Sequence, residues 1–350
     1  MNAKTELHII MPGICGPLAE VHTLKNSKVV HDWIKLLSQS HQYPSSTNIH
    51  DVIAEIFDLS IDEDFPSAAL CMLADGSYDA SMSYMHADPV HLRADLDHAV
   101  LVSSVDLDIS EQESELLCDT LNQHFNQDGL TFFRASKDQW FVSANNKIRM
   151  KTTSLADATG RNVNFILPQG EDSRYWKKVL TEAQMLLHSH DINSIRENSA
   201  QQCINSLWFH GSGELPEYGN AKIASVCSDN HMLKGLAAYI KSEHLEIPGS
   251  ADSYIKHLLS NRTHAFSVLH ISDLEHLINY TDVSIWLDGL TTTLQQWIYP
   301  LIKLANNNKI EIVLYPCNGK KYQLSKYNGL KFWHKGTLDQ HISCHKSDVR

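Results

Sequence analysis

The chain lacks the features that mark secreted and membrane-inserted proteins. Its seven Cys form no CxxC pair and no even-numbered framework, which is typical of reduced thiols and excludes a disulfide scaffold. No apolar run approaches the length of a membrane span, and the run near the first residue is too short for the core of a signal peptide. We therefore expect a cytoplasmic protein with no membrane partner.

Basic residues are also scarce. The 350 residues include 29 Lys and Arg against 41 Asp and Glu, which gives a formal net charge of −12. Binding to a nucleic-acid backbone requires clustered Lys and Arg side chains, so we expect no nucleic-acid partner.

Common catalytic and cofactor-binding motifs are absent as well. The sequence contains no Walker A loop, no dinucleotide-binding glycine fingerprint and no HExxH zinc motif. The 21 His are dispersed along the chain, and most His residues in such a chain are surface or hydrogen-bonded core residues. The sequence by itself therefore predicts no metal site.

Short apolar runs, in contrast, alternate with helical patterns over much of the chain. Strands separated by helices need crossover connections, which favours a mostly parallel sheet covered by helices. We expect its strands at residues 6–11, 206–210, 265–270, 309–315 and 330–334. Helices are expected at residues 29–38, 49–59, 173–188 and 231–242, with a further long helix capped by Asp282.

The middle of the chain follows a different pattern. Charged residues 88–95 are expected to form a loop before a strand at 99–105, and Ser110-Glu111-Gln112-Glu113 is a capping box that opens a helix. A hairpin of strands 130–134 and 139–143 comes next. We therefore predict a core of residues 1–75 and 205–350, with an inserted α+β domain of residues 76–204.

Residues 184–213 are rich in polar side chains beside a strongly apolar strand. Burying such side chains is unfavourable unless something binds them. Gln184 and His188 lie four residues apart and so share a helix face, and Asn193 and Arg196 are expected to follow the end of that helix. The segment predicts one wall of a small-molecule site.

The end of this segment adds a strand terminus and a glycine turn. Asn205 precedes the strand, His210 ends it, and Gly211 and Gly213 would let backbone N–H groups approach a ligand. Open α/β sheets place ligands at the carboxyl ends of their strands. The alternative is a polar network that only holds two domains together.

Two further groups could bind an anion. Arg93 could bind a carboxylate or phosphate, oriented by Asp88 or Asp95, with His91 between them; the alternative is a solvated loop with internal salt bridges. Lys234, near a helix start, could pair with a phosphate, although a Lys at such a position is most often solvated.

The order of these motifs resembles the archaeal-type cofactor-independent phosphoglycerate mutases. It is more similar still to a bacterial phosphoglycerate-mutase-like group of pathogenicity-regulatory proteins. The resemblance covers roughly residues 75 to 315 and rests on the segments DPVHLRADLD, ISEQESELLCDTLNQHF, HDINSIREN, INSLWFHGSGELP, MLKGLAAYI and WIYPLI. It implies an alkaline-phosphatase-like α/β fold, a mostly parallel sheet covered by helices, with an inserted α+β domain.

The resemblance also implies substrate-recognition roles for individual residues. The positions that match the motifs of the family are Arg93, Asp95, Asn193, Arg196, Asn205, His210 with its glycine turn, and Lys234. The match is not complete, because Asp95 stands where the family has Asn and His210 stands where it usually has Arg or Trp.

The catalytic positions of the family are mostly absent. Its members use two divalent metals and a Ser nucleophile. Here Pro12-Gly13 replaces a metal-binding Asp-Gly, Pro316-Cys317 replaces an Asp-His pair, and Asp273, His276 and Asp282 have the wrong spacing for the AspxxxHis motif of the family. We therefore expect no metal cofactor and assign no catalytic residue.

Three functional hypotheses follow. The leading one is a phosphoglycerate-mutase-like protein with a degenerate bimetal site that binds a small phosphorylated or carboxylated metabolite as a sensor or scaffold. The second is an active phosphoryl-transfer enzyme or isomerase with a non-standard site, and the third is an interaction protein whose pocket is vestigial. We expect a small anionic metabolite as partner and leave a protein partner open. One cleft between the core and the insert should contain the candidate binding residues. They are Arg93, Asn193, Arg196, Asn205, His210 and Lys234.

Overall fold

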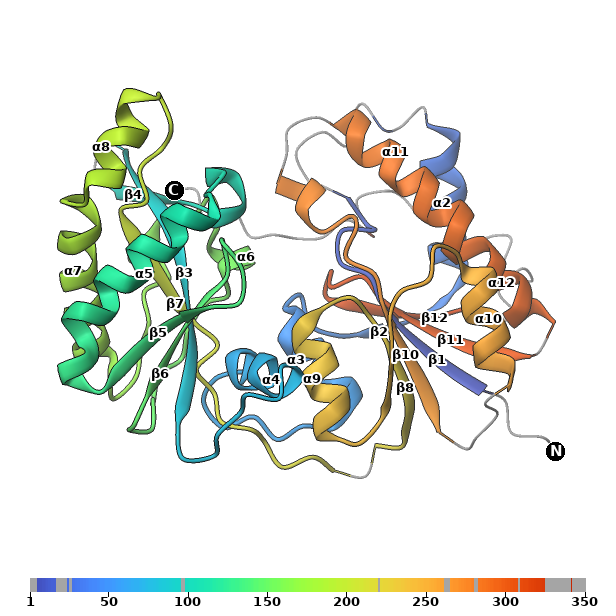
Figure 1. The fold of residues 1–350 in the computed structure, drawn as a ribbon. Coiled ribbons are helices and arrows are strands. Elements are labelled where there is room, and N and C mark those ends of the chain that lie inside the picture. Colours follow the sequence, from blue (N-terminus) through green and yellow to red (C-terminus); the bar gives the residue numbers. More distant parts are fainter. Residues whose placement is uncertain are drawn as a thin grey trace. The chain divides into compact units, whose positions relative to one another are not determined.

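The chain divides into two compact units (Figure 1). The computed structural model describes residues 5–16, 24, 27–95, 98–219, 221–260, 265–279, 283–307, 309–324 and 341. The first unit combines Met1–Ser60 with Tyr218–Arg350, and the second is the continuous segment Ile61–Glu217. Residues 61–75 and 205–217, which the sequence analysis assigns to the core, lie in the second unit.

The first unit contains a seven-stranded sheet in the order β2-β12-β11-β1-β10-β8-β9. Neighbouring strands from β11 to β9 are parallel, whereas β12 and β2 extend one edge in antiparallel pairing. The strands are β1 (Thr5–Ile10), β2 (His41–Pro44), β8 (Ile223–Cys227), β9 (Glu243–Leu245), β10 (Phe266–His270), β11 (Ile310–Tyr315) and β12 (Lys320–Leu324). The predicted mostly parallel sheet is confirmed, and three of its predicted strands are β1, β10 and β11.

The central position of β1 follows from its sequence. Leu7, Ile9 and Ile10 are fully buried, and a strand that is covered on both faces must be nearly continuously apolar. Helices α2, α10, α11 and α12 lie over one face of the sheet, and α3 and α9 lie over the other (Figure 1). Their bounds are α2 Lys28–Gln39, α3 Ile49–Phe57, α9 His231–Tyr239, α10 Ala251–Ser260, α11 Val283–Thr293 and α12 Tyr299–Asn306.

The long amphipathic helix of the sequence analysis is present in three parts. A π-helical turn at Leu294–Ile298 joins α11 to α12. Its apolar residues recur at helical spacing and are buried; they are Trp286, Leu290, Leu294, Trp297 and Leu301. The proposed cap Asp282 and the predicted strand at 330–334 lie outside the described residues.

The second unit contains a five-stranded antiparallel sheet in the order β4-β3-β6-β5, with β7 also paired to β3. Its strands are β3 (Ser83–Asp95), β4 (His98–Val102), β5 (Leu130–Arg134), β6 (Trp140–Ala144) and β7 (Ser206–His210). Its helices are α4 (Ser67–Ala74), α5 (Glu111–Phe125), α6 (Leu155–Ala158), α7 (Ser173–His188) and α8 (Asp191–Asn198). The predicted hairpin is β5 and β6, and the predicted capping box opens α5.

One predicted strand lies in a different sheet from the one expected. Ser206–His210 is a strand with the predicted bounds, but it pairs antiparallel with β3 and not with β1, β10 or β11. Every residue of β7 is buried, and a strand that is buried on both faces carries no signal of which strand lies beside it. The expectation that residues 206–210 share a sheet with residues 6–11, 265–270 and 309–315 is therefore wrong.

The charged segment at 88–95 is a strand and not a loop. It forms the second half of β3, whose side chains alternate between the two faces of the sheet. Asp88 is buried, whereas Arg93 and Asp95 are exposed at the far end of the strand. The high charge density misled the prediction because most of these charges lie at the solvated end of a long strand.

No helix among the described residues is both long enough and apolar enough to cross a lipid bilayer.

Candidate functional site

The guanidinium of Arg196 is engaged inside the second unit. Arg196 is fully buried on α8, which begins at Asp191 after the predicted end of α7. Its Nε donates to the Gln202 carbonyl at 2.7 Å, one terminal nitrogen binds Glu113 at 2.9 Å, and the other donates to the Leu107 carbonyl. All three nitrogens have protein partners, and these partners lie within the second unit and not between two domains.

Glu113 is the carboxylate of this network. Partial burial raises its pKa, but the hydrogen bonds from Ser110 and the ion pair with Arg196 outweigh burial, so the net pKa is lowered. The capping box at the start of α5 therefore also binds the buried Arg of α8.

The two Asn of the predicted wall also bind backbone groups. Asn193 donates to the carbonyls of Leu187 and Ile204 and accepts the N–H of Ile204. Asn205 exchanges both of its hydrogen bonds with the backbone of Leu92. Both amides therefore join chain segments within the second unit.

The remaining predicted residues of this unit are spread over its surface and edges. Gln184 donates to Ser206 Oγ at 3.0 Å, His188 is exposed on α7, and His91 Nδ1 donates to the Cys203 carbonyl at 2.9 Å. Arg93 lies five residues after Asp88 on β3 and so points to the opposite face of the strand, where Asp88 cannot orient it. Lys234 lies on α9 of the first unit, so its convergence with the other residues stays a prediction.

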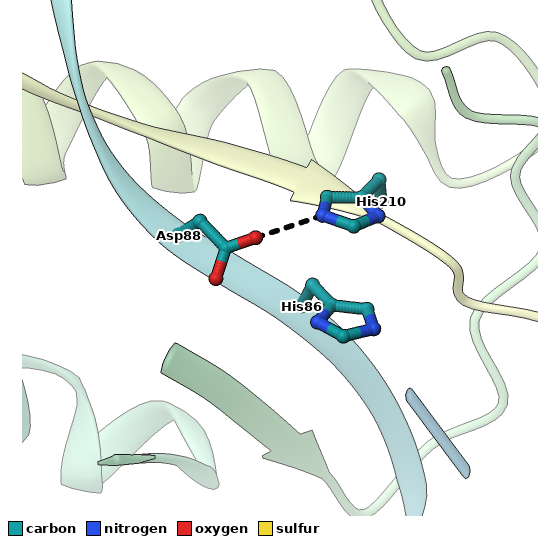
Figure 2. Close-up of side chains that lie close together, drawn as sticks. All are labelled: His86, Asp88 and His210. Carbon is teal, nitrogen blue, oxygen red and sulfur yellow. Dashed lines mark hydrogen bonds and ion pairs between the residues drawn. The ribbon is translucent and has the colours of Figure 1, made fainter. Parts of the chain in front are cut away.

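The structure does bring together Asp88, His210 and a third residue, His86 (Figure 2). His86 and Asp88 are two residues apart on β3 and share a face, and His210 pairs with His86 in register from β7. His210 Nε2 and Asp88 Oδ2 are 2.9 Å apart, and the two imidazole rings stack with centroids 4.3 Å apart. All three side chains are buried.

Burial controls the charge state of this cluster. It raises the pKa of Asp88 to about 6, against the opposing effects of His86 and the Trp140 N–H, and it lowers the pKa of His210 to about 3. At neutral pH His210 is therefore uncharged and donates its Nε2–H to the Asp88 carboxylate. The lone pair of the ring then lies on Nδ1, which has no hydrogen-bond partner among the described residues.

His86 was missed by sequence reasoning. The signal was its spacing from Asp88, because two residues that are two apart on a strand project from the same face. The assignment of 88–95 to a loop prevented this reading.

The glycine turn after β7 packs against protein rather than leaving room for a ligand. The Gly211 N–H binds Thr152 Oγ1, and the Ser212 N–H binds Asp64 Oδ2. Gly211 has a φ of +69°, and a Cβ there would lie 1.9 Å from Ser67 Oγ; a Cβ at Gly213 would lie 1.9 Å from the Asp64 carbonyl oxygen. These glycines allow close packing against residues 64–67.

In the first unit, the carboxyl edge of the sheet begins with the loop after β1. Gly13 O accepts the indole N–H of Trp286, Ile14 O accepts that of Trp33, and a Cβ at Gly13 would lie 2.3 Å from Leu274 O. This loop is packed into the apolar core, and Pro12 offers no side-chain ligand to a metal.

A buried imidazole lies at the same edge, at the end of β10. Ser228, which follows β8, accepts the N–H of Asn230, and its hydroxyl is 3.1 Å from His270 Nδ1. If that hydroxyl donates to Nδ1, both groups are satisfied and the ring proton lies on Nε2. His270 is 1% exposed, its Nε2 has no partner among the described residues, and burial lowers its pKa to about 4.

Comparison with curated proteins gives one consistent result, although no protein-family profile matches the sequence. A 2,3-bisphosphoglycerate-independent phosphoglycerate mutase of Methanosarcina mazei is 26% identical over 174 residues, which is 47% of this chain and 44% of the relative. Its counterpart in Methanosarcina acetivorans is 26% identical over 149 residues, 41% of this chain and 38% of its own length. The chain is a homologue of the archaeal cofactor-independent phosphoglycerate mutases. The matches span less than half of each relative.

Comparison with solved structures concerns the fold of this mutase homologue. A protein of Pyrococcus horikoshii aligns with a TM-score of 0.53 at 14% identity, over 93% of this chain and 88% of its own. A cofactor-independent phosphoglycerate mutase of Thermoplasma acidophilum aligns with a TM-score of 0.45 at 14% identity, over 92% of this chain and 89% of its own. The expected fold class, an α/β fold with a mostly parallel sheet covered by helices, is confirmed. The likeness to the bacterial pathogenicity-regulatory group stays a prediction.

Proposed function

We propose that this phosphoglycerate-mutase-like protein binds a small phosphorylated or carboxylated metabolite at the carboxyl edge of the first unit's sheet. In this proposal the bimetal chemistry of the family is lost. Binding serves a sensor or scaffold role, in which occupancy of the site changes the association with a protein partner.

The observation that carries the proposal is the buried Nε2 of His270, which has no hydrogen-bond partner among the described residues. Nε2 is a donor in the tautomer in which Ser228 Oγ donates to Nδ1. A buried N–H without an acceptor costs about 1–3 kcal/mol, so its presence in a folded protein calls for a partner such as a bound acceptor. His270 ends β10 beside β8, at the edge where open α/β sheets bind ligands. An anionic oxygen is an acceptor that this N–H can bind.

The next helix supports an anion rather than a neutral acceptor. Ser228 precedes α9, whose first turn carries the exposed Lys234. The N-terminus of a helix favours negative charge through its free N–H groups and its dipole, and Lys adds a compact positive charge. Of the predicted ligand-binding residues, Lys234 is thus the one that we retain at this site.

The loops after β1 and β11 support the loss of metal chemistry. Divalent metals at phosphoryl-transfer sites require carboxylate and imidazole ligands, whereas here Pro12 and Pro316 stand at two of the family's ligand positions. Trp286 and Trp33 additionally hold the carbonyls of Gly13 and Ile14 in the core. These residues do not fit two divalent metals.

Thermal stability in the presence of phosphorylated three-carbon acids tests the proposal. A ligand present at 100 times its dissociation constant stabilises the native state by about 2.7 kcal/mol. We expect 3-phosphoglycerate or a related acid to stabilise the wild-type protein. Both His270→Phe and Lys234→Ala should reduce this stabilisation. The control is Lys178→Ala on the exposed face of α7, which should leave the stabilisation unchanged.

Two results would contradict the proposal. One is no stabilisation by any such acid at millimolar concentration. The other is mutase turnover with added Mn²⁺, which would favour the alternative of an active enzyme with a non-standard site.

A further inference from the structure

The cluster of His86, Asp88 and His210 has the composition of a metal site. One ligand atom from each residue can be chosen such that all three lie within 4.8 Å of one another. Two imidazole nitrogens and one carboxylate oxygen are a common donor set for Zn²⁺ and other divalent transition metals. Figure 2 shows the three side chains on one face of the β3–β7 pair.

The surrounding residues hold these side chains in place. Asp88 Oδ1 accepts the backbone N–H of Trp140 at 3.0 Å, which leaves Oδ2 directed at His210. The His86 ring lies between the rings of Phe141, at 4.6 Å, and His210, at 4.3 Å. A site whose ligands are fixed by their neighbours loses little conformational entropy when it binds an ion.

Two buried polar atoms nearby have no hydrogen-bond partner among the described residues. They are His210 Nδ1 and Ser67 Oγ. The close packing of Gly211 places Ser67 Oγ beside the cluster, since a Cβ at Gly211 would lie 1.9 Å from this oxygen and 3.1 Å from His86 Cδ2. An unsatisfied hydroxyl in a native interior commonly marks a bound water or ion. Nδ1, in contrast, is a vacant acceptor that can take up a proton from the other nitrogen of the ring.

We propose that His86, Asp88 and His210 bind one Zn²⁺ ion, which joins β3 to β7. The ion takes the place of the proton between His210 Nε2 and Asp88 Oδ2, and that proton moves to the partnerless Nδ1 of the same ring. Ser67 Oγ, or a water that it binds, completes the tetrahedral coordination.

All three ligand atoms lie within 4.8 Å of one another, so the distances between them must change by at most about 1.5 Å. Ligands at about 2.0–2.1 Å from a tetrahedral Zn²⁺ lie about 3.3 Å apart. His210 Nε2 and Asp88 Oδ2 are 2.9 Å apart and must separate slightly. The parallel imidazole rings must also tilt, which the soft χ2 torsion of His allows.

This site is separate from the family's two metals and from the proposed function. Its residues lie in the second unit, whereas Pro12, Asp273, Pro316 and His270 belong to the first. All three ligands are buried. With Ser67 Oγ as the fourth ligand no coordination position stays open to a substrate, which is the arrangement of a structural zinc. The ion would stabilise the insert whether or not a metabolite binds the core.

Metal content and cobalt spectroscopy of the full chain test this inference. The protein is stripped with EDTA, dialysed with Zn²⁺ and analysed for bound metal. We expect about one equivalent in the wild type and an affinity at least about 100-fold lower in His86→Gln and Asp88→Asn, because loss of an outer-shell partner alone costs 10–100-fold. The matched control is His124→Gln, an exposed His of the same unit, which should retain the ion.

Co²⁺ titration of the wild type keeps the test decisive if the variants do not fold. A four-coordinate site gives an intense visible absorption, whereas hydrated Co²⁺ gives a weak one. Absence of both bound zinc and the intense band in the wild type would refute the site. Equal zinc content in folded Asp88→Asn and wild-type protein would assign the metal to other His residues and would also refute it.

Discussion

At the scale of single residues, the structure separates two kinds of buried polar group that the sequence analysis treated alike. The donors of Arg196 and the amide of Asn193 are bound by protein groups. His210 Nδ1 and His270 Nε2 have no partner among the described residues. The first kind maintains the fold. The second kind lies beside the two proposed ligands, a metal on the other nitrogen of the His210 ring and an anion at His270 Nε2.

Arg196→Ala should therefore destabilise the fold rather than abolish ligand binding. Removal of a buried cation leaves Glu113 and two carbonyls without their partner, and such a loss costs about 3 kcal/mol. The matched control is Arg134→Ala, which removes a more exposed ion pair. Its partner is Glu111, which lies on α5 like Glu113, and the free energy of unfolding should fall by less than about 1 kcal/mol. Urea unfolding of both variants measures the difference.

The reverse result would restore Arg196 as a ligand-binding residue. If Arg196→Ala unfolded like the wild type but lost its stabilisation by 3-phosphoglycerate, the network around α8 would not explain this residue.

At the scale of elements, patterns of apolar residues predicted where strands and helices lie in the sequence. They predicted less well which strands pair with each other. β7 has the predicted bounds, yet it pairs with β3 in a different sheet. The turn after β7 depends on a contact with another element, because Gly211 packs against Ser67 at the start of α4.

Gly211→Ala should disrupt this contact between elements. Gly76 is the control, because its φ of +68° is close to the +69° of Gly211 but the space around its Cβ position is open. Gly76→Ala should therefore lower the free energy of unfolding only by the cost of placing Ala in the left-handed region, about 1–2 kcal/mol. Gly211→Ala should cost about 1–3 kcal/mol more, because its Cβ overlaps Ser67 Oγ. Thermal or urea unfolding of both variants measures the two costs.

A Ser67→Ala background tests the source of the extra cost. Without the hydroxyl, the nearest Ser67 atom to the new methyl group is Cβ, at 3.2 Å. Gly211→Ala should then cost little more than Gly76→Ala. An unchanged difference would mean that the strain arises elsewhere.

At the scale of the whole molecule, each unit has a core of its own. One apolar cluster includes Leu7, Trp286 and Trp297 of the first unit, and another includes Phe125, Trp140 and Trp176 of the second. Leu59 and Tyr218, which flank the second unit in sequence, form a β-bridge in the first unit. The ends of the insert are thus held together by the core unit.

The fragment Ile61–Glu217 should therefore fold by itself. A segment of about 150 residues with its own core buries enough apolar surface for cooperative unfolding. Circular dichroism of the expressed fragment should show one cooperative thermal transition. A fragment with boundaries at 76 and 204 lacks α4 and β7 and should fold poorly, which makes it the matched comparison. Equal folding of both fragments would contradict these boundaries.

The sequence by itself determined the local elements and the fold class. Buried strands such as β1, the capping box of α5 and the apolar stripe of α11 and α12 follow from periodicity and short-range hydrogen bonds, which depend on residues close in sequence. The motif order likewise indicated the mutase homology.

Only the tertiary structure decided which polar residues are satisfied and which are not. Arg196 meets Glu113 from 83 positions away, and Asp88 meets His210 from 122 positions away. Such contacts depend on which strands pair and in what register, and one apolar strand resembles another until its neighbour is known. Pairing between β3 and β7 is what turned a predicted loop and a predicted core strand into one buried cluster of His86, Asp88 and His210.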